Sequence, residues 1–236
     1  MNRLSFEQDL WAAGYQLVCG VDEVGRGCLY GPVCVAAVIW PCNSTLEQLP
    51  KVRDSKKLTM KQRELLYDQI IESALAVHVV YSSAQEIDKI NILQATLKCM
   101  TTAMADIRPR PQYCLIDGNI MPKTDIPGHS IIKGDDRSLS IAAASIIAKV
   151  SRDRMMIEAV RLNPSLAVYG IDHNMGYGSL DHRKALTVYG NTPDHRQSFK
   201  WKPVEGLNSP VLQVSSSPVE GLNGPVVENN TEISEF

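Results

Sequence analysis

Acidic residues stand at or just beyond the ends of several apolar segments of this chain. In open α/β sheets, sites form beyond the carboxyl ends of the strands, so acids placed there on neighbouring strands are expected to meet. Their mutual repulsion would raise their pKa values unless a cation lies among them. The residues in question are Asp22, Glu23, Asp117 and Asp135.

A site made of these residues would bind hard cations. No compact cluster of His or Cys accompanies them, and the six cysteines lack zinc-type spacing, so the ligands would all be oxygen atoms. Such ligand sets suit Mg²⁺ or Mn²⁺. Two such ions about 4 Å apart can activate a water and stabilise the leaving oxygen of a phosphodiester. The expected chemistry is therefore hydrolysis of a phosphate ester.

Each acid also has a simpler explanation. An acid after a strand is often a turn former, and Asp117 before Gly118 fits that role by itself. Asp22 and Glu23 cannot both point to one face of a regular strand, so we expect the strand to bend or end there. The choice of the last acid stays open as well.

Two acids compete with Asp135 for that place. Asp136 is its direct neighbour, and Asp153 lies between Arg152 and Arg154, where an ion pair on a helix surface explains it well. The sequence by itself does not choose among the three.

The order of the expected elements indicates an α/β sandwich with a mixed sheet. Three early strands lie close together in the chain, which favours antiparallel hairpins there and parallel pairing later. The expected strands are 17–23, 33–40, 76–82, 112–117 and 129–133, and the expected helices are 60–75, 84–106 and 138–161, with Ser138 as an N-cap of the last.

Charge is unevenly distributed along the 236 residues. The net charge is −2, but residues 204–236 hold five acids and no Lys or Arg, so removing −5 from −2 leaves +3 for residues 1–203. Basic residues gather in 51–63 and 133–154, which favours phosphate binding. Residues 204–236 also contain a short duplication rich in Pro, Gly, Ser and Asn, and we expect them to be disordered.

No apolar run approaches the length that crosses a bilayer, and the amino-terminal residues lack an apolar signal core. We therefore expect a cytoplasmic protein without membrane contact, with reduced and mostly buried cysteines.

Several motifs, in order from about residue 17 to about residue 202, together resemble those of the bacterial type of the ribonuclease HII family. None is conclusive by itself, and their combination is very specific. The motifs are Asp22-Glu23-Val24-Gly25-Arg26-Gly27 with Gly31-Pro32-Val33, Asp54-Ser55-Lys56-Lys57-Leu58, Asn91-Ile92 with Ala95-Thr96, Asp117-Gly118-Asn119, Lys133-Gly134-Asp135, Ser140 to Val150 with Arg152-Asp153-Arg154, Gly176-Tyr177-Gly178 with His182, and His195-Arg196 with Ser198-Phe199.

The resemblance implies a ribonuclease H-like fold for residues 1–203, a mixed five-stranded sheet with helices on both faces and a small C-terminal helical region. It implies that two Mn²⁺ or Mg²⁺ ions are bound with the substrate. It favours Asp135 over Asp136, although the family position of Asp136 is usually small, which leaves that choice open. The metal-binding carboxylates that it implies are Asp22, Glu23, Asp117 and Asp135.

The resemblance also implies contacts to the substrate. A glycine-rich loop would read the ribose 2′-hydroxyl, a tyrosine would pack on the sugar at an RNA–DNA junction, and a Ser-Lys pair would hold a backbone phosphate. Met175 stands where many relatives carry Lys, so one phosphate contact is expected to be missing. The residues are Gly25, Arg26 and Gly27, then Tyr177, and finally Ser55 and Lys56.

The activity implied by the resemblance is cleavage of the RNA strand of RNA/DNA hybrids, and of DNA at single embedded ribonucleotides. The sequence leaves the oligomeric state open, and a monomer is our default expectation. The products would carry a 5′-phosphate. A non-catalytic nucleic-acid-binding module is the main rival and would not need the acids. An integrase or exonuclease on a related fold would lack the glycine loop, and a P-loop nucleotidase would need a motif that the chain does not contain.

Overall fold

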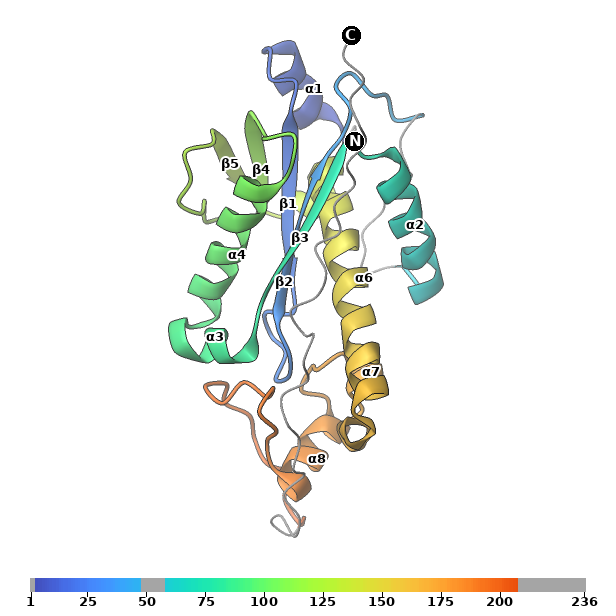
Figure 1. Ribbon diagram of the computed structural model, residues 1–236, viewed down its shortest axis with the longest axis vertical. Coiled ribbons are helices and arrows are strands. Elements are labelled where there is room, and N and C mark those ends of the chain that lie inside the picture. Colours follow the sequence, from blue (N-terminus) through green and yellow to red (C-terminus); the bar gives the residue numbers. More distant parts are fainter. Residues whose placement is uncertain (1–2, 48–57, 208–236) are drawn as a thin grey trace.

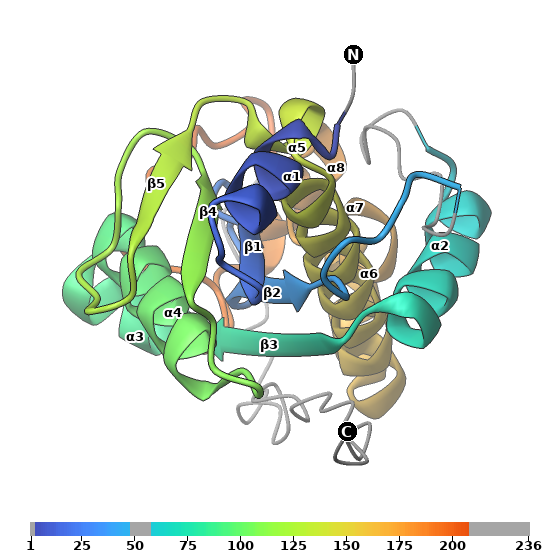
Figure 2. The ribbon, with the colours of Figure 1, turned by 90° about the horizontal axis from the view of Figure 1, so that it is seen from above.

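The computed structural model describes residues 3–47 and 58–207, which form a mixed sheet between two layers of helices (Figures 1 and 2). The sheet has five strands in the order β3-β2-β1-β4-β5. β1 pairs antiparallel with β2, and β2 with β3, whereas β1–β4 and β4–β5 are parallel. The expected mixed sheet, antiparallel in its early strands and parallel later, is confirmed, but β2 and β3 are joined by residues 40–75, which include a helix, and not by a hairpin. The strands are β1 (Val18–Val24), β2 (Val33–Ile39), β3 (Ala76–Ser82), β4 (Tyr113–Asp117) and β5 (Gly128–Ile131).

Helices cover both faces of the sheet, so β2 is buried along its whole length. Alternate residues of β2 contribute to two apolar clusters, one with α2 and α6 and the other with α4. The helices are α1 (Ser5–Ala12), α2 (Met60–Ser73), α3 (Ala84–Ile90), α4 (Ile92–Asp106), α5 (Gly134–Arg137), α6 (Leu139–Leu162), η2 (Pro164–Tyr169, a 3₁₀ helix), α7 (Ile171–Asn174) and α8 (Leu180–Tyr189).

The long helix α6 lies against β1 at very short range. A methyl group at Gly20 would come within 2.2 Å of the carbonyl carbon of Ser140, so only glycine fits there. Ser138 caps the helix by accepting a hydrogen bond from the N–H of Ile141, as expected. This close contact brings the first turns of α6 over β1, where Asp22 lies.

One expected helix, 84–106, is wrong, because the structure contains two helices there. Asn91 has a φ of 67°, which a continuous helix does not allow. Its side chain accepts a hydrogen bond of 3.1 Å from the N–H of Gln94 and so caps α4. Asn stabilises both a helix start and a positive φ, and this explains the break.

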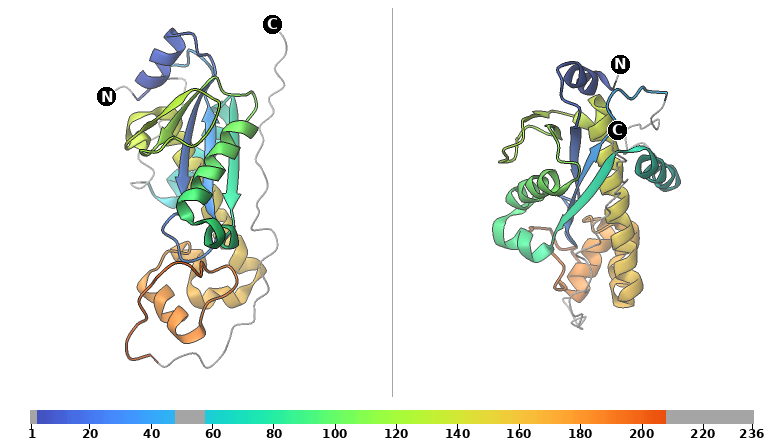
Figure 3. Two further views of the ribbon diagram at one scale, coloured as in Figure 1. Left: turned by 90° about the vertical axis from the view of Figure 1, so that its left-hand side faces the viewer. Right: turned by 45° about the horizontal axis from the view of Figure 1, so that its top comes forward.

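The C-terminal helical region lies at one end of the sheet (Figures 1 and 3). A third apolar cluster, which includes Tyr30, Met156 and Tyr169, forms its core. This region confirms the small helical part that was expected. Beyond it, the N–H of Val204 donates to Oγ1 of Thr187. Residues 208–236 lie outside the described residues, so the boundary at 203 and the disorder of 204–236 stay predictions.

Two further expectations concern composition. None of the helices in the described parts of the chain is long and apolar enough to cross a membrane. All six cysteines are free thiols, and all but Cys42 are buried.

Candidate metal centre and nucleic-acid site

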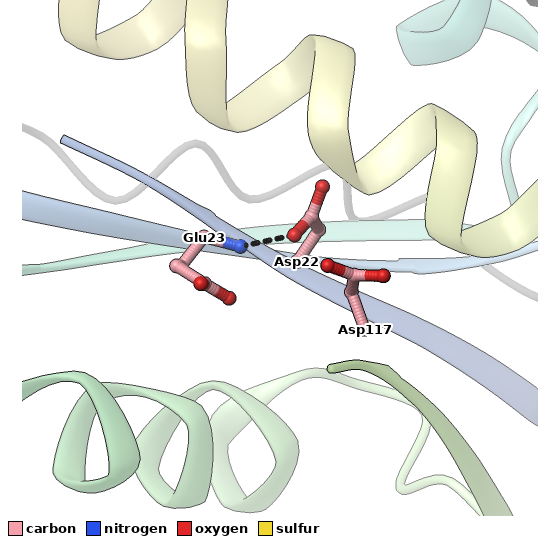
Figure 4. A group of neighbouring side chains, drawn as sticks. All are labelled: Asp22, Glu23 and Asp117. Carbon is pink, nitrogen blue, oxygen red and sulfur yellow. Dashed lines mark hydrogen bonds between the residues drawn. The ribbon is translucent and has the colours of Figure 1, made fainter. Parts of the chain in front are cut away.

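Three of the predicted acids converge. Asp22 and Glu23 come from β1, and Asp117 is the last residue of β4. Each offers a carboxylate oxygen, and these oxygens all lie within 4.8 Å of one another (Figure 4). Mg²⁺ binds oxygen atoms at about 2.1 Å, so small side-chain shifts would let one ion contact all three.

The neighbours Asp22 and Glu23 meet although β1 continues to Val24. The strand was expected to bend or end at these residues, and β1 ends at Val24, directly after Glu23. Its pairing with β4 ends earlier, at Val21 and Ile116, while its pairing with β2 continues to Val24. In Figure 4, Asp22 points toward α6 and Glu23 toward the opposite side of the sheet, with the Asp117 carboxylate beside them. Beyond Val21, β1 has no β4 partner beside it, so side chains from the two faces of β1 can approach each other there.

Asp135 lines the same cavity but is not one of the three clustered acids. It is only 8% exposed and lies in the short helix α5, beyond the end of β5. The N–H of Gly134 donates a hydrogen bond of 2.6 Å to Oδ1 of Asp117, which ties α5 to the end of β4. Asp136, in contrast, is half-exposed, lies 3.6 Å from Arg3, and is not among the residues that line the cavity.

The electrostatics of the cluster are unfavourable for bare carboxylates. Burial, followed by the charges of Glu23 and Asp117, raises the pKa of Asp22 well above its usual range, and a hydrogen bond from Ser145 opposes this in part. Burial also raises the pKa of Glu23, although Arg26, whose guanidinium lies 3.1 Å from it, acts in the other direction. A divalent cation would reverse both effects, because it favours the ionised carboxylates.

The acids line a cavity of about 420 Å³. Two basic residues, Arg63 and Lys149, face the four acids there, so the lining is net negative. Nζ of Lys149 lies 2.8 Å from Asp153 and 5.9 Å from the centre of the Tyr177 ring. In the sequence, Lys149 stood out as part of a basic segment, and both Lys149 and Ser145 fell within a matched motif, but neither was predicted to be a site residue. The signal available was their spacing: Ser145 and Lys149 are four residues apart and therefore share one face of α6.

The glycine loop follows Val24, which lines this cavity, and lies next to Tyr177, which lines it as well. Cys28 forms an isolated β-bridge with Tyr177, and the Tyr177 ring lines the cavity while remaining 41% exposed. Gly25 has a φ of 89°, and a methyl group on it would come within 2.3 Å of Nε of Arg152. A methyl group on Gly27 would meet no described atom within 4 Å. Gly25 is thus required by the interior, whereas Gly27 leaves space for another molecule.

Three other predictions have different outcomes. Asp153 pairs with Lys149 and is buried, so the expected ion pair exists but its placement on the surface is wrong. Met175 is buried, and its carbonyl accepts a hydrogen bond of 2.7 Å from Arg152. Ser55 and Lys56 lie outside the described residues, so their phosphate contact stays a prediction.

The residues present fit a hard divalent cation. The donors are buried or partly buried carboxylate oxygens from separate segments, and the ionised forms of Asp22 and Glu23 are destabilised by their surroundings. Oxygen-only donor sets select Mg²⁺ or Mn²⁺ over softer metals. The structure therefore contains a candidate site for divalent metal.

Comparison with known families and proteins gives a consistent result. The family model described as Ribonuclease HII matches residues 19–202. The Ribonuclease HII of Thermosynechococcus vestitus is 49% identical over 197 residues, which cover 83% of this chain and 89% of the relative. That of Halalkalibacterium halodurans is 47% identical and covers 84% of this chain and 72% of the relative.

Solved structures give the same fold. The ribonuclease H2 of Pyrococcus horikoshii superposes with a TM-score of 0.64 at 28% identity, covering 78% of this chain and 94% of that chain. The ribonuclease HII of Archaeoglobus fulgidus, solved in complex with PCNA, superposes with a TM-score of 0.65 at 27% identity, covering 80% of this chain and 97% of that chain. The ribonuclease H-like fold expected from the sequence is confirmed.

Proposed function

This chain belongs to the ribonuclease HII family, and on that premise we propose that it is a metal-dependent endonuclease that cleaves the RNA strand of RNA/DNA hybrids. The observation that carries the proposal is the convergence of carboxylates from β1 and β4 in one net-negative cavity. A module that only binds nucleic acid has no need for acids whose burial is unfavourable, because acids repel phosphate.

Four residues are assigned to the metal: Asp22, Glu23, Asp117 and Asp135. Two Mn²⁺ or Mg²⁺ ions bound with the substrate would supply Lewis-acid chemistry, activating a water and neutralising charge on the leaving oxygen. Ser145 orients Asp22 by a hydrogen bond, and the N–H of Gly134 holds Asp117. Water attack on phosphorus breaks the bond to the 3′ oxygen, so the products carry a 3′-hydroxyl and a 5′-phosphate.

The substrate contacts follow from what surrounds the acids. Backbone groups of Gly25, Arg26 and Gly27 read the ribose 2′-hydroxyl, which both donates and accepts hydrogen bonds. The exposed ring of Tyr177 packs on a sugar beside them, and Lys149 contacts a phosphate. Ser55 and Lys56 hold a backbone phosphate. We further assign the protein to the cytoplasm and to a monomeric state.

A matched set of duplexes tests the proposal. RNA/DNA, RNA/RNA and DNA/DNA duplexes of one sequence are incubated with and without Mn²⁺ or Mg²⁺, and only the RNA strand of the hybrid should be cut, and only with metal. Asp117→Asn should lower the rate about a thousandfold, because lost metal chemistry costs several kcal/mol of barrier. Equal cleavage by this variant would exclude the assigned site, and cleavage of all three duplexes would exclude hybrid specificity.

The same enzyme should cut a DNA duplex that contains one ribonucleotide. The incision is read from the end groups, with a 3′-hydroxyl and a 5′-phosphate expected. An enzyme that cuts long hybrids and leaves this duplex intact would contradict this part of the proposal and leave the hybrid activity standing.

A further inference from the structure

Three loop segments interlock behind the cavity. The segment 25–31 contains the glycine loop, 175–177 leads to Tyr177, and 192–196 follows α8. The N–H of Leu29 donates to the carbonyl of Gly176 at 2.8 Å, and the N–H of Gly31 donates to the carbonyl of Asp194 at 2.9 Å. A further bond of 2.8 Å runs from the N–H of Arg196 to the carbonyl of Leu29. The conformation of the glycine loop is thus coupled to the other two segments.

Arg196 is the centre of this arrangement. It is 2% exposed, and its guanidinium donates three hydrogen bonds to backbone carbonyls: 2.7 Å to Gly25, 2.8 Å to Arg26 and 3.0 Å to Gly31. The ring of Phe199 lies 4.9 Å from the guanidinium carbon. A planar fork with fixed donors can hold three carbonyls in one geometry, which a flexible ammonium cannot.

The two carbonyls of Gly25 and Arg26 belong to the peptide groups whose N–H groups are those of Arg26 and Gly27. A charge-assisted bond at a carbonyl oxygen polarises the whole peptide group and strengthens its N–H as a donor. It also occupies the oxygen, so the loop presents donors rather than acceptors. Such a loop matches the 2′-oxygen of a ribose and gains nothing from the hydrogen atom that replaces this oxygen in deoxyribose.

We propose that Arg196 is a positioning residue for ribose recognition, which fixes the loop 25–27 and directs its N–H groups at the 2′-oxygen of the substrate. This inference rests on the proposed function. Arg196 is not among the residues that line the acidic cavity, so its effect should fall on the choice of RNA over DNA and not on metal binding.

Binding without cleavage tests this role. Wild type, Arg196→Lys and Arg196→Gln are titrated in the absence of divalent ions with a DNA duplex containing one ribonucleotide and with the all-DNA duplex. The ratio of the two dissociation constants measures discrimination. We expect the discrimination between the two duplexes to fall roughly tenfold in both variants, because one charge-assisted hydrogen bond contributes an effect of about this size. Arg161→Lys, which changes an exposed arginine paired with Glu158 on α6, should keep the wild-type ratio.

A second readout separates positioning from general damage. The rise in melting temperature on adding Mn²⁺ should be equal in wild type and the Arg196 variants, because the carboxylates are intact. If Arg196→Lys keeps the wild-type ratio, or weakens binding of both duplexes equally, the inference is overturned. If wild type itself does not discriminate, the proposed function fails instead, so the two failures are distinguishable.

The inference can also be tested on the wild-type protein alone, so the test does not depend on whether the Arg196 variants fold. In the wild-type protein, the amide hydrogens of Arg26 and Gly27 should exchange more slowly with the ribonucleotide duplex bound than with the all-DNA duplex bound at equal saturation. Equal exchange of both amides in the two complexes would overturn the assignment, whatever the stability of the Arg196 variants.

Discussion

Two neighbouring regions of this protein bury charged or titratable groups, and they treat them in opposite ways. In the acidic cavity, burial and like charges raise the pKa of Asp22 and Glu23. Behind the glycine loop, Arg152 is fully buried, yet its guanidinium donates to the carbonyls of Tyr30, Pro32 and Met175. In the first region the surroundings oppose the ionised forms of the buried acids, and the proposed cation would offset this. In the second region the chain itself supplies the hydrogen-bond partners of the buried charge.

A pair of buried histidines belongs to the second kind. The N–H of Thr192 donates to Nδ1 of His195, so a neutral His195 carries its proton on Nε2. That proton points at Nε2 of His182, 3.0 Å away, which leaves the His182 proton on Nδ1, directed at the carbonyl of Tyr177. Each nitrogen has a defined role without any charge. The contrast indicates two roles for buried polar groups. Those whose hydrogen-bond partners all come from the protein hold the loops in position, whereas those whose charge the protein does not neutralise lie at the proposed catalytic site.

Removing charge should therefore have opposite effects in the two regions. Arg152→Met substitutes an apolar side chain of similar length and removes the guanidinium donor from three carbonyls, so we expect a loss of about 3 kcal/mol in the free energy of unfolding. Urea unfolding at neutral pH measures it. Arg161→Met, which removes an exposed arginine from the same helix, should change stability by less than about 0.5 kcal/mol. Equal effects of the two variants would remove the basis of the comparison.

Asp22→Asn should instead stabilise the metal-free protein at pH 7. The folded pKa of Asp22 is raised, so the stability contributed by its neutral form is present below its unfolded pKa of about 4 and is lost as pH rises through the raised pKa. The advantage of the variant should disappear near pH 4.

Divalent metal should reverse this order. At a metal concentration one hundred times its dissociation constant, wild type gains about 2.7 kcal/mol, and Asp22→Asn should lose most of that gain. Thermal unfolding in chelator and in Mn²⁺ measures both effects. If metal-free Asp22→Asn is less stable than wild type at pH 7, then groups of the protein itself stabilise the ionised carboxylate of Asp22, and no cation is needed for this.

The histidine pair should make the protein sensitive to acid. Burial, followed by the nearby His182, lowers the pKa of His195 to about 3, and burial lowers that of His182 as well. Both groups are neutral when folded, so the stability they contribute is present above about pH 6.5 and is lost as pH falls below it. For His195 the loss by pH 5 is about 2 kcal/mol. His195→Gln should lower the free energy of unfolding at pH 7 and reduce its dependence on pH between pH 7 and 5. Parallel pH profiles of the free energy of unfolding for wild type and variant would contradict this prediction.

The sequence was sufficient for the parts of the site that lie at strand ends. Asp22, Glu23 and Asp117 follow apolar segments, and parallel strands bring their carboxyl ends together, so their convergence could be predicted. The mixed sheet followed from the spacing of the elements. The meeting of Asp22 and Glu23 needed the structure, because it depends on where β4 stops pairing, and no local pattern encodes that point.

The groups that position the loops could not be predicted. Arg152, His182, His195 and Arg196 appeared in motifs, but their roles come from contacts to carbonyls far away in the chain, such as Gly25 and Tyr177. The break at Asn91 was missed for a related reason, since apolar spacing continues across it and only the backbone dihedral reveals it. Asp153 was placed on the surface because neighbouring arginines suggested solvent, whereas its partner is Lys149, one turn away.

Lys149 lies where the two regions meet, so it gives the finest test of the comparison. It lines the acidic cavity and pairs with the buried Asp153. If it contacts a phosphate, Lys149→Gln should lower kcat/KM about tenfold and reduce the slope of log Kd against log salt by about 1. Lys149→Arg should restore the slope, and Lys184→Gln, which changes an exposed lysine on α8, should leave both values unchanged. If Lys149→Gln lowers the stability but leaves the salt slope unchanged, Lys149 does not contact a phosphate. Its role would then be the ion pair with Asp153, so it would belong with the buried groups that position the loops and not with the acidic cavity.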